Sequence, residues 1–302
     1  MRVYRMFKYH NDLICYNQTK IAHDADNLFI LDKHSTNEGT WSLLQVTGGE
    51  INVVFVDGED RALSSHYLNA TTAPIIIPPM AWHKIEPVSE SFYAELEFYC
   101  KPHRYFSKKH HLGNVHSDLL YVYQAYLQGQ GAQDVLDVGS GTGRNALYLS
   151  LLGHKVHAID IKEPLLRQMN HIAHQEKLDD LTATIHDLNK PLSLPEASFD
   201  FVVSTVCLQF LNPARIPALL QELQASTRAQ GIHFLVYPIQ SEHFSLPQSF
   251  TYLSEPDELL HLYQDSGWSI LEYKESIGQL HRLDEMGRPI QGLFALLLAQ
   301  KT

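Results

Sequence analysis

The chain has 302 residues, 44% of them hydrophobic, which is enough for two domains that each bury a core of their own. Its 23 basic and 34 acidic residues give a net charge of −11, which disfavours nucleic acid as a partner and favours a small-molecule substrate. The longest apolar runs are too short to span a bilayer. Residues 1–5 lead into no apolar signal segment, so we expect a cytoplasmic protein with no membrane partner.

The N-terminal third predicts an all-β domain over residues 1–100. Short β-rich runs cover 41–47 and 51–56, and Gly48-Gly49 between them is typical of a hairpin turn. Ile75-Ile76-Ile77 and the alternating run 92–99 follow at similar spacing. Short strands without helical periodicity indicate a small barrel or sandwich. A possible homo-oligomer would form through this domain.

The pattern changes after a basic linker, residues 101–116, whose alternative interpretation is a merely solvated connection. A helical pattern opens the region 117–302, and strands then alternate with helices, which is typical of a parallel sheet covered on both faces. The expected strands are 133–138, 155–160, 181–186, 200–205, 231–237, 268–274 and 293–299. We expect helices between the first six, a loop at 278–292, and an antiparallel last strand.

Residues 135–145 carry the most informative motif of the chain. An apolar strand ends at Asp137, and glycines at 139, 141 and 143 then open a helix at Arg144-Asn145. Such a loop lets backbone N–H groups and a helix N-terminus approach a ligand. Arg144 stands where a dinucleotide fingerprint needs its last glycine, and no Lys-Ser or Lys-Thr follows for a P-loop. The next strand ends in Asp160, which can accept both ribose hydroxyls, so the motif indicates an S-adenosylmethionine (SAM) methyltransferase. Gly139, Gly141, Gly143, Arg144 and Asn145 are therefore candidate cofactor-binding residues.

Three further positions lie where strands of such a sheet end. Asp137 can face the cationic methionine portion of SAM, and Asp187-Leu188 can meet the adenine amino group and cover its ring. A turn or helix-capping acid stays open as the alternative for Asp187. Ser204 closes the fourth strand, at the edge where ligands collect. The sequence after it, Thr205-Val206-Cys207, lacks the Pro-Pro-aromatic motif of adenine and cytosine methyltransferases, so base methylation is not expected.

Taken together, these features resemble the long form of the tellurite-resistance methyltransferase family TehB. The resemblance spans almost the whole chain, and its most specific elements are Tyr-Phe-Ser-Lys-Lys at 105–109 and Leu-His-Arg-Leu-Asp at 280–284. The other matching segments are 34–41, 82–83, 98–101, 141–149, 203–206, 278–279 and 294–295. The resemblance implies a Rossmann-like, seven-stranded class I methyltransferase preceded by a cupin-like β-domain, with Tyr105 among the cofactor-binding residues.

The resemblance also implies an activity: SAM-dependent methylation of tellurite, and of selenium compounds, in detoxification of a toxic substance. A tellurite anion brings its own lone pair, so positive charge is what the site has to supply. His281, Arg282 and Arg288 are the candidate catalytic residues. The chain departs from the family at Gln209, Gln279, Gln291 and Leu293, and the last two replace basic residues. We therefore expect weak tellurite activity or compensation from Arg104, Lys108 or Lys109.

Two other functions fit the same residues. The acceptor could be a thiol, a halide or a small metabolite, or the protein could be a SAM-binding regulator without turnover. Metal is not predicted, because a metal-binding cupin needs two clustered histidines, a glutamate and a further histidine, and only His34 and His83 are placed for this. Cys15, Cys100 and Cys207 are odd in number and widely spaced, so a disulfide framework is not expected.

Overall fold

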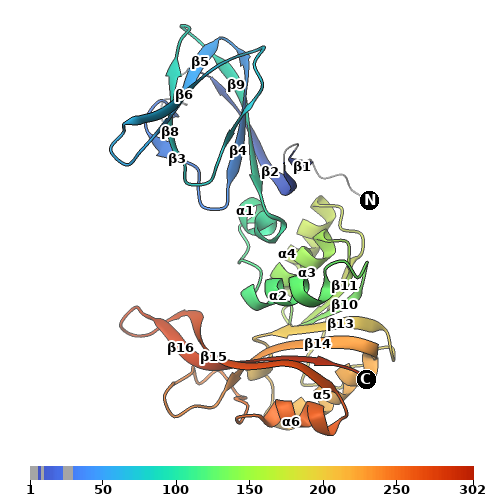
Figure 1. Ribbon diagram of the computed structural model, residues 1–302. Coiled ribbons are helices and arrows are strands. Elements are labelled where there is room, and N and C mark those ends of the chain that lie inside the picture. Colours follow the sequence, from blue (N-terminus) through green and yellow to red (C-terminus); the bar gives the residue numbers. More distant parts are fainter. Residues whose placement is uncertain (1–5, 8–9, 23–29) are drawn as a thin grey trace. The chain divides into compact units, whose positions relative to one another are not determined.

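The computed structural model describes residues 6–7, 10–22 and 30–302 (Figure 1). The chain divides into two compact units, Met1–Asn114 and Val115–Thr302, and each is described by itself. Among the described residues, no helix is both long and apolar enough to cross a membrane.

The described part of residues 1–100, which forms most of the N-terminal unit, is built of strands, as predicted (Figure 1). Its strands are β1 (Met6–Phe7), β2 (His10–Ala22), β3 (His34–Ser35), β4 (Trp41–Gly48), β5 (Glu50–Val56), β6 (Ala62–Asn69), β7 (Ile75–Ile77), β8 (Trp82–Pro87) and β9 (Tyr93–Cys100). They form a five-stranded sheet in the order β1-β2-β9-β4-β7 and a four-stranded sheet in the order β3-β8-β5-β6. Alternate residues of both sheets face inward and build one core, which is aliphatic apart from the ring of Phe92 and includes Leu44 and Ile51.

The predicted hairpin across Gly48-Gly49 is wrong. Strand β4 pairs with β7 and β9, whereas β5 pairs with β6 and β8, so the turn carries the chain from one sheet to the other. Gly49 has φ +72°, and a Cβ there would lie 2.2 Å from the Ser91 carbonyl oxygen. The two glycines thus permit a close crossing between sheets, a use of glycine that a local pattern does not distinguish from a hairpin turn.

The basic segment is helical rather than an open linker, and it belongs to the N-terminal unit. It contains η2 (Pro102–Arg104), a 3₁₀ turn, and α1 (Tyr105–His110), in which Tyr105 and Phe106 are buried. Arg104 forms an ion pair with Glu38 at 2.8 Å, and Lys108 donates to the Glu38 carbonyl oxygen. Arg104 and Lys108 therefore contact groups of their own unit.

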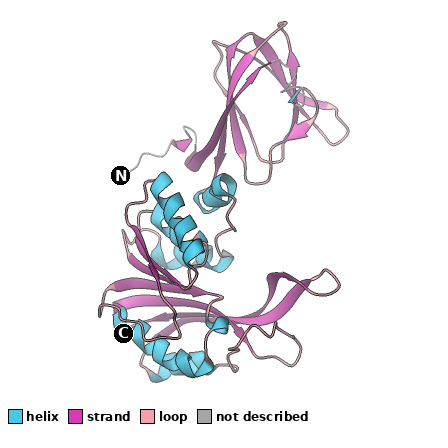
Figure 2. Ribbon diagram, turned by 180° about the vertical axis from the view of Figure 1, so that it is seen from behind, coloured by secondary structure: helices cyan, strands magenta, loops and turns pink. Residues whose placement is uncertain are grey.

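The C-terminal unit is a seven-stranded sheet with helices on both faces (Figures 1 and 2). Its helical elements are α2 (Ser117–Val122), the π-helical turn η3 (Tyr123–Leu127), α3 (Arg144–Leu151), α4 (Glu163–Gln175), η4 (Leu208–Phe210), η5 (Pro213–Arg215), α5 (Ile216–Ser226) and α6 (Glu258–Asp265). Its strands are β10 (Asp134–Val138), β11 (Lys155–Asp160), β12 (Leu181–Ile185), β13 (Phe199–Thr205), β14 (Thr227–Ile239), β15 (Ser269–Leu283) and β16 (Pro289–Gln300).

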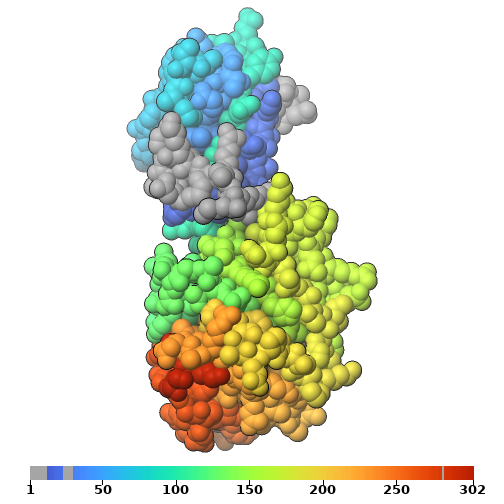
Figure 3. All heavy atoms as spheres, turned by 90° about the vertical axis from the view of Figure 1, so that its right-hand side faces the viewer, coloured from blue at the N-terminus to red at the C-terminus, as the bar shows by residue number. Residues whose placement is uncertain are grey.

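The order of this sheet is β12-β11-β10-β13-β14-β16-β15, and β16 runs antiparallel to both of its neighbours. The fold prediction, including the antiparallel last strand, is confirmed. Strand β16 lies between β14 and β15, and Leu297 and Leu298 on it are fully buried. In a space-filling view the last residues of the chain lie among atoms of earlier segments (Figure 3).

Two local predictions in this unit are wrong. Residues 186–198 between β12 and β13 form no helix, since Pro191 and Pro195 interrupt the short segment. Residues 278–292 are not an open loop, because β15 and β16 continue as a paired ribbon as far as Leu283 and Pro289. The tip at 284–288 is closed by the Asp284 carboxylate, which accepts hydrogen bonds from the backbone N–H groups of Met286 and Arg288.

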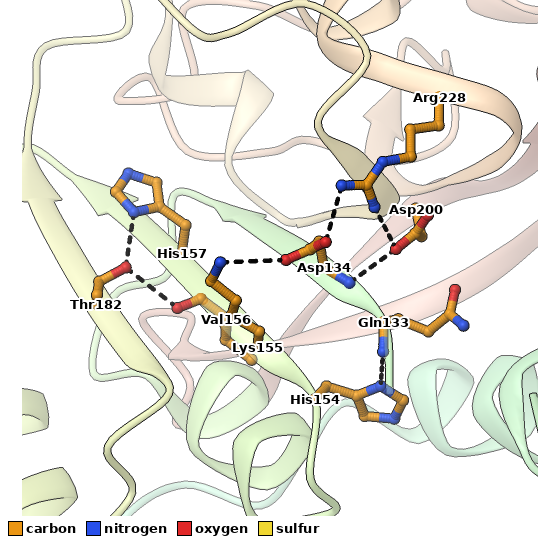
Figure 4. A network of polar contacts seen from close by, with 9 residues as sticks. All are labelled: Gln133, Asp134, His154, Lys155, Val156, His157, Thr182, Asp200 and Arg228. Atoms are coloured by element: carbon orange, nitrogen blue, oxygen red, sulfur yellow. Dashed lines mark hydrogen bonds and ion pairs between the residues drawn. The ribbon is translucent and has the colours of Figure 1, made fainter. Parts of the chain in front are cut away.

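Charged residues tie the amino ends of the parallel strands together (Figure 4). Arg228 on β14 contacts Asp134 of β10 at 2.9 Å and Asp200 of β13 at 2.7 Å, and Lys155 of β11 lies 3.6 Å from Asp134. These side chains are partly exposed, so their contribution to stability is modest. This cluster lies at the edge of the sheet opposite to the carboxyl ends of the strands, and it is therefore separate from the loops that follow those ends.

Candidate active site

A pocket of about 360 Å³ lies at the carboxyl edge of the parallel strands. It is bounded by the segments that follow four adjacent strands, β10 to β13, which is where ligands bind in open α/β sheets. Its volume is within the range of small-molecule sites. The lining residues are Gly139, Gly141, Asp160, Ile161, Lys162, Leu165, His186, Asp187, Leu188, Asn189, Val206, Cys207, Phe210 and Leu211.

The glycine loop forms one wall of the pocket. The backbone φ angle is positive at all three glycines of the loop, between +57° and +79° at Gly139, Gly141 and Gly143. Residues that carry a Cβ rarely adopt such angles. A Cβ on Gly139 would collide with Cys207, and one on Gly143 would collide with Met169. A Cβ on Gly141 would meet nothing within 4 Å, so this backbone faces open space in the pocket. A ligand in the pocket can therefore come close to the backbone of this loop.

Asp160, at the end of β11, fixes this loop. One carboxylate oxygen accepts the Gly141 N–H at 2.8 Å, and the other accepts the Lys162 N–H at 2.8 Å. The side chain is only partly buried and lines the pocket. Because each carboxylate oxygen has two acceptor positions, both can also receive a ribose hydroxyl.

The segment after β12 supplies the opposite wall. Asp187 accepts hydrogen bonds from the backbone N–H and side-chain amide of Asn189, so it also closes a turn. Leu188 is buried and faces the pocket together with the half-exposed ring of Phe210. The Nε2 atom of His186 is buried with no hydrogen-bond partner among the described residues. This wall therefore offers apolar surface and polar groups suited to a heteroaromatic ring.

Asp137 lies next to the pocket, at the end of β10, and is buried. Burial raises the pKa of Asp137 to about 7, although the Arg144 guanidinium and a hydrogen bond from the Ala146 N–H oppose the shift. Its Oδ2 atom has no hydrogen-bond partner among the described residues. An orphaned carboxylate oxygen of this kind suits a cationic ligand, such as the methionine portion of SAM.

The next predicted residues hold the framework of the loop. Asn145 is buried, donates to the Thr205 hydroxyl at 3.0 Å and accepts from the His116 N–H at 3.1 Å. The Ser204 hydroxyl donates to the Val138 carbonyl oxygen at 3.1 Å. Through these bonds the two residues link the glycine loop to the end of β13 and to the start of the unit.

The candidate catalytic residues lie on the outer part of the β15–β16 ribbon. The last pair between β14 and β16 is Ile239 with Leu293, whereas β15 and β16 stay paired beyond it, so residues 278–292 project past the carboxyl end of β14 (Figure 1). We call these residues the arm. His281 and Arg282 lie on the β15 strand of the arm, and Arg288 lies at its tip.

The two arginines of the arm differ in their partners. Arg288 forms an ion pair with Asp284 at 3.0 Å. A hydrogen bond from the Arg288 backbone N–H, and after it the contact with the Arg288 side chain, holds the pKa of the Asp284 carboxyl below its usual range. Arg282 is exposed and donates to the Ser249 hydroxyl at 3.3 Å, and none of the described carboxylates pairs with it. Arg282 therefore presents the less compensated charge.

The segment 241–253 connects the arm to the pocket. Ser249 contacts Arg282, and the adjacent Phe250 packs edge-on against Phe210, a pocket-lining residue, with ring centroids 5.3 Å apart. Thr251 donates its backbone N–H to the Gln209 carbonyl oxygen at 2.7 Å. Two neighbouring residues thus join the guanidinium of Arg282 to the wall of the pocket.

The structure brings five of the predicted cofactor residues into the pocket lining, namely Gly139, Gly141, Asp160, Asp187 and Leu188. Tyr105 belongs to the N-terminal unit, where it is buried and accepts a hydrogen bond from Lys109. Sequence reasoning missed Ile161, Lys162, His186, Cys207 and Phe210. Ile161 and Lys162 follow the predicted strand 155–160, His186 ends the strand 181–186, and Cys207 and Phe210 lie within five residues after the strand 200–205. Examining the residues around each strand end would therefore have found them.

Comparisons with known proteins agree over the whole chain. The family model for "Tellurite resistance protein TehB" matches residues 98–298, and that for "TehB-like domain" matches residues 28–96. A probable SAM-dependent methyltransferase TehB of Haemophilus influenzae is 34% identical over 96% of this chain and 99% of its own. A protein of Eikenella corrodens named hemagglutinin 1 is 32% identical, covering 93% of this chain and 90% of its own.

The crystal structure of TehB from Haemophilus influenzae matches with a TM-score of 0.87 and 33% identity. The match covers 97% of this chain and 99% of that one, so it includes both units. Family models, sequence identity and fold agree, and the chain belongs to the TehB family.

Proposed function

We propose that this protein, a SAM-dependent methyltransferase, methylates a chalcogen oxyanion of the tellurite type. The description of its family as a tellurite resistance protein supports this acceptor. The observation that carries the proposal is the position of Arg282, an uncompensated cation in a protein of net charge −11 that is linked to the pocket wall through Ser249 and Phe250.

SAM supplies a methyl group on a sulfonium, and an acceptor lone pair displaces the neutral thioether in line. The protein has to align the two reactants and hold the anion, and a tellurite lone pair needs no general base. In this proposal the glycine loop and Asp160 hold the cofactor, and His281 and Arg282 hold the acceptor. Arg288 contributes through the hairpin turn that it closes with Asp284.

Mass spectrometry of the soluble products after incubation with SAM and tellurite, selenite or a small thiol tests the proposal. We expect the wild type to form a methylated tellurium or selenium oxyanion together with an equal amount of S-adenosylhomocysteine, because each acceptor–carbon bond forms as the carbon–sulfur bond of SAM breaks. Arg282→Ala should lower turnover roughly tenfold, the lower end of losses from removing an electrostatic contact, since the side chain is exposed. Arg167→Ala, on the surface of α4, is the matched control and should keep full activity.

Other outcomes separate the alternatives. Methylated thiol without any tellurium or selenium product would replace the oxyanion by a neutral acceptor. SAM binding without turnover on every acceptor would indicate a regulator. A turnover that is insensitive to ionic strength would argue against a solvent-facing anion site.

We also propose a cytoplasmic location and a homo-oligomer formed through the β-domain. No disulfide joins Cys15, Cys100 and Cys207, which suits a reducing compartment. Strand β6 is an edge strand with Leu63 and Tyr67 exposed, and such edges can pair with a second copy. Sedimentation of the wild type and of Leu63→Lys tests the oligomer, which the charge should dissociate.

A further inference from the structure

The N-terminal unit encloses a second cavity, of about 380 Å³, between its two sheets. Strands β2, β4, β7 and β9 line it from one sheet, and β3 and β8 line it from the other. Register pairs Ser42 with Phe98 and Leu44 with Leu96, and all four side chains line the cavity. Leu44 belongs to the aliphatic core, so the cavity has an apolar floor.

Above this floor the lining becomes polar. Ser42 is 1% exposed, yet its hydroxyl oxygen has no hydrogen-bond partner among the described residues. The Tyr16 and Thr40 hydroxyl oxygens, also in the lining, lie 3.2 Å apart, and the Nδ1 atom of the buried His83 bonds to the Ala81 carbonyl oxygen at 2.9 Å. Leaving a buried hydroxyl unpaired is unfavourable, so the position of Ser42 points to a polar group that is supplied by a ligand.

The absence of charge from the described lining disfavours an ionic ligand. Among the described residues that line the cavity, none is Asp, Glu, Lys or Arg. Burial lowers the pKa of His83 to about 4, so this ring is neutral near pH 7. The His34 ring lies 4.1 Å from it between centroids and is tilted by 57°, but the described part of the chain has no group of three or more metal-ligating side chains. An ion would lose its hydration here without a charged partner.

We propose that this cavity is a binding site for a small uncharged molecule that has an apolar ring or chain and one hydroxyl or carbonyl group. The apolar part lies on the floor around Leu44 and Leu96, and the polar group pairs with the Ser42 hydroxyl. Tyr16, Thr40 and the neutral His83 provide the neighbouring donors and acceptors. The size of the cavity suits a ligand of this class.

Saturation-transfer NMR with three probes of equal ring size tests the proposal on the full chain. The probes are cyclohexanol, cyclohexanecarboxylate and cyclohexylammonium, each at millimolar concentration and with saturating SAM, which occupies the other pocket. We expect transfer to cyclohexanol and little to either ion. No transfer to cyclohexanol, or equal transfer to the ions, overturns the proposal.

Two variants place the probe in this cavity. Ser42→Ala removes an unpaired hydroxyl, so the variant should fold at least as well as the wild type and bind cyclohexanol roughly three- to tenfold more weakly. Ser42→Leu should occupy the space in which the polar group of the ligand is expected and abolish the signal. Ser65→Ala, on the exposed face of β6, is the matched control. Undiminished binding by both Ser42 variants, with SAM affinity intact, would show that the probe lies elsewhere.

Discussion

Asp160 has two tasks that a single carboxylate can combine. It accepts two backbone N–H groups that order the glycine loop, and it faces the pocket where the ribose hydroxyls are expected. Loop order and ribose binding therefore depend on the same side chain. Asparagine at position 160 would keep the shape of the side chain, but an NH2 group would replace one of the two acceptor oxygens.

Asp160→Asn should weaken SAM binding roughly five- to a hundredfold, since about 1–3 kcal/mol is typical for leaving a partly buried donor unpaired. Titration calorimetry measures the change. Asp179→Asn, an exposed acid in the segment before β12, is the control and should bind SAM like the wild type. Equal affinity in Asp160→Asn and the wild type would remove the ribose assignment.

Asp137 predicts a pH dependence with a definite sign. Its pKa rises from about 4 in the unfolded chain to about 7 in the empty folded protein, because burial disfavours the charged carboxylate. Its contribution to stability is thus complete at low pH and is lost as pH rises through this window. Thermal melts without SAM should show Asp137→Asn gaining stability over the wild type between these two pH values.

The same shift predicts stronger SAM binding as pH rises toward about 7, with little change above, because the cationic cofactor favours the ionised carboxylate. Asp137→Asn should bind more weakly and lose this pH dependence. A wild-type affinity that stays flat across the window would show that Asp137 does not face a positive charge.

At the scale of elements, the arm lies outside the main sheet of the C-terminal unit, because its residues do not pair with β14. Gly278 and Gly292 form a cross-strand pair where the arm begins, and a Cβ on either would collide with Phe294 or Leu246. Beyond that pair, β15 and β16 bond only to each other within the described sheet. Removing the residues beyond this pair should therefore leave the stability of the unit unchanged and affect only the binding of the acceptor.

Replacing residues 279–291 by Asn-Gly should give a two-residue hairpin turn between Gly278 and Gly292. We expect this variant to fold and to bind SAM like the wild type, but to lose most turnover on tellurite, since Arg282 and His281 are gone. Calorimetry measures SAM binding, and mass spectrometry of the soluble products measures turnover. Full turnover by the shortened protein would move the acceptor site away from the arm.

At the scale of the whole molecule, the two units have separate cores and separate cavities. A fragment of residues 115–302 should fold alone and bind SAM with the affinity of the full chain. In calorimetry of the full chain, SAM should raise the melting temperature of one of two transitions and leave the other unchanged. A single transition, or an insoluble fragment, would show that the units fold as one.

The sequence by itself determined the strands of the C-terminal unit, its antiparallel last strand and the position of the glycine loop. These follow from local causes: the spacing of apolar residues, and the positive φ that only glycine adopts without strain. Asp160 and the pair Asp187-Leu188 were found in the same way, because the carboxyl ends of parallel strands meet at one edge. The family resemblance, now confirmed, rested on motifs of the same local kind.

Only the tertiary structure decided features that depend on contacts between distant segments. It separated β4 from β5, since the partners of a strand are chosen by packing between sheets and not by the turn that joins two neighbours. It extended β15 and β16 into an arm, and it left the hydroxyl of Ser42 and one oxygen of Asp137 buried without a partner. The burial of a side chain and the partners of a strand depend on residues that are far apart in the sequence. A short stretch of sequence therefore does not predict them.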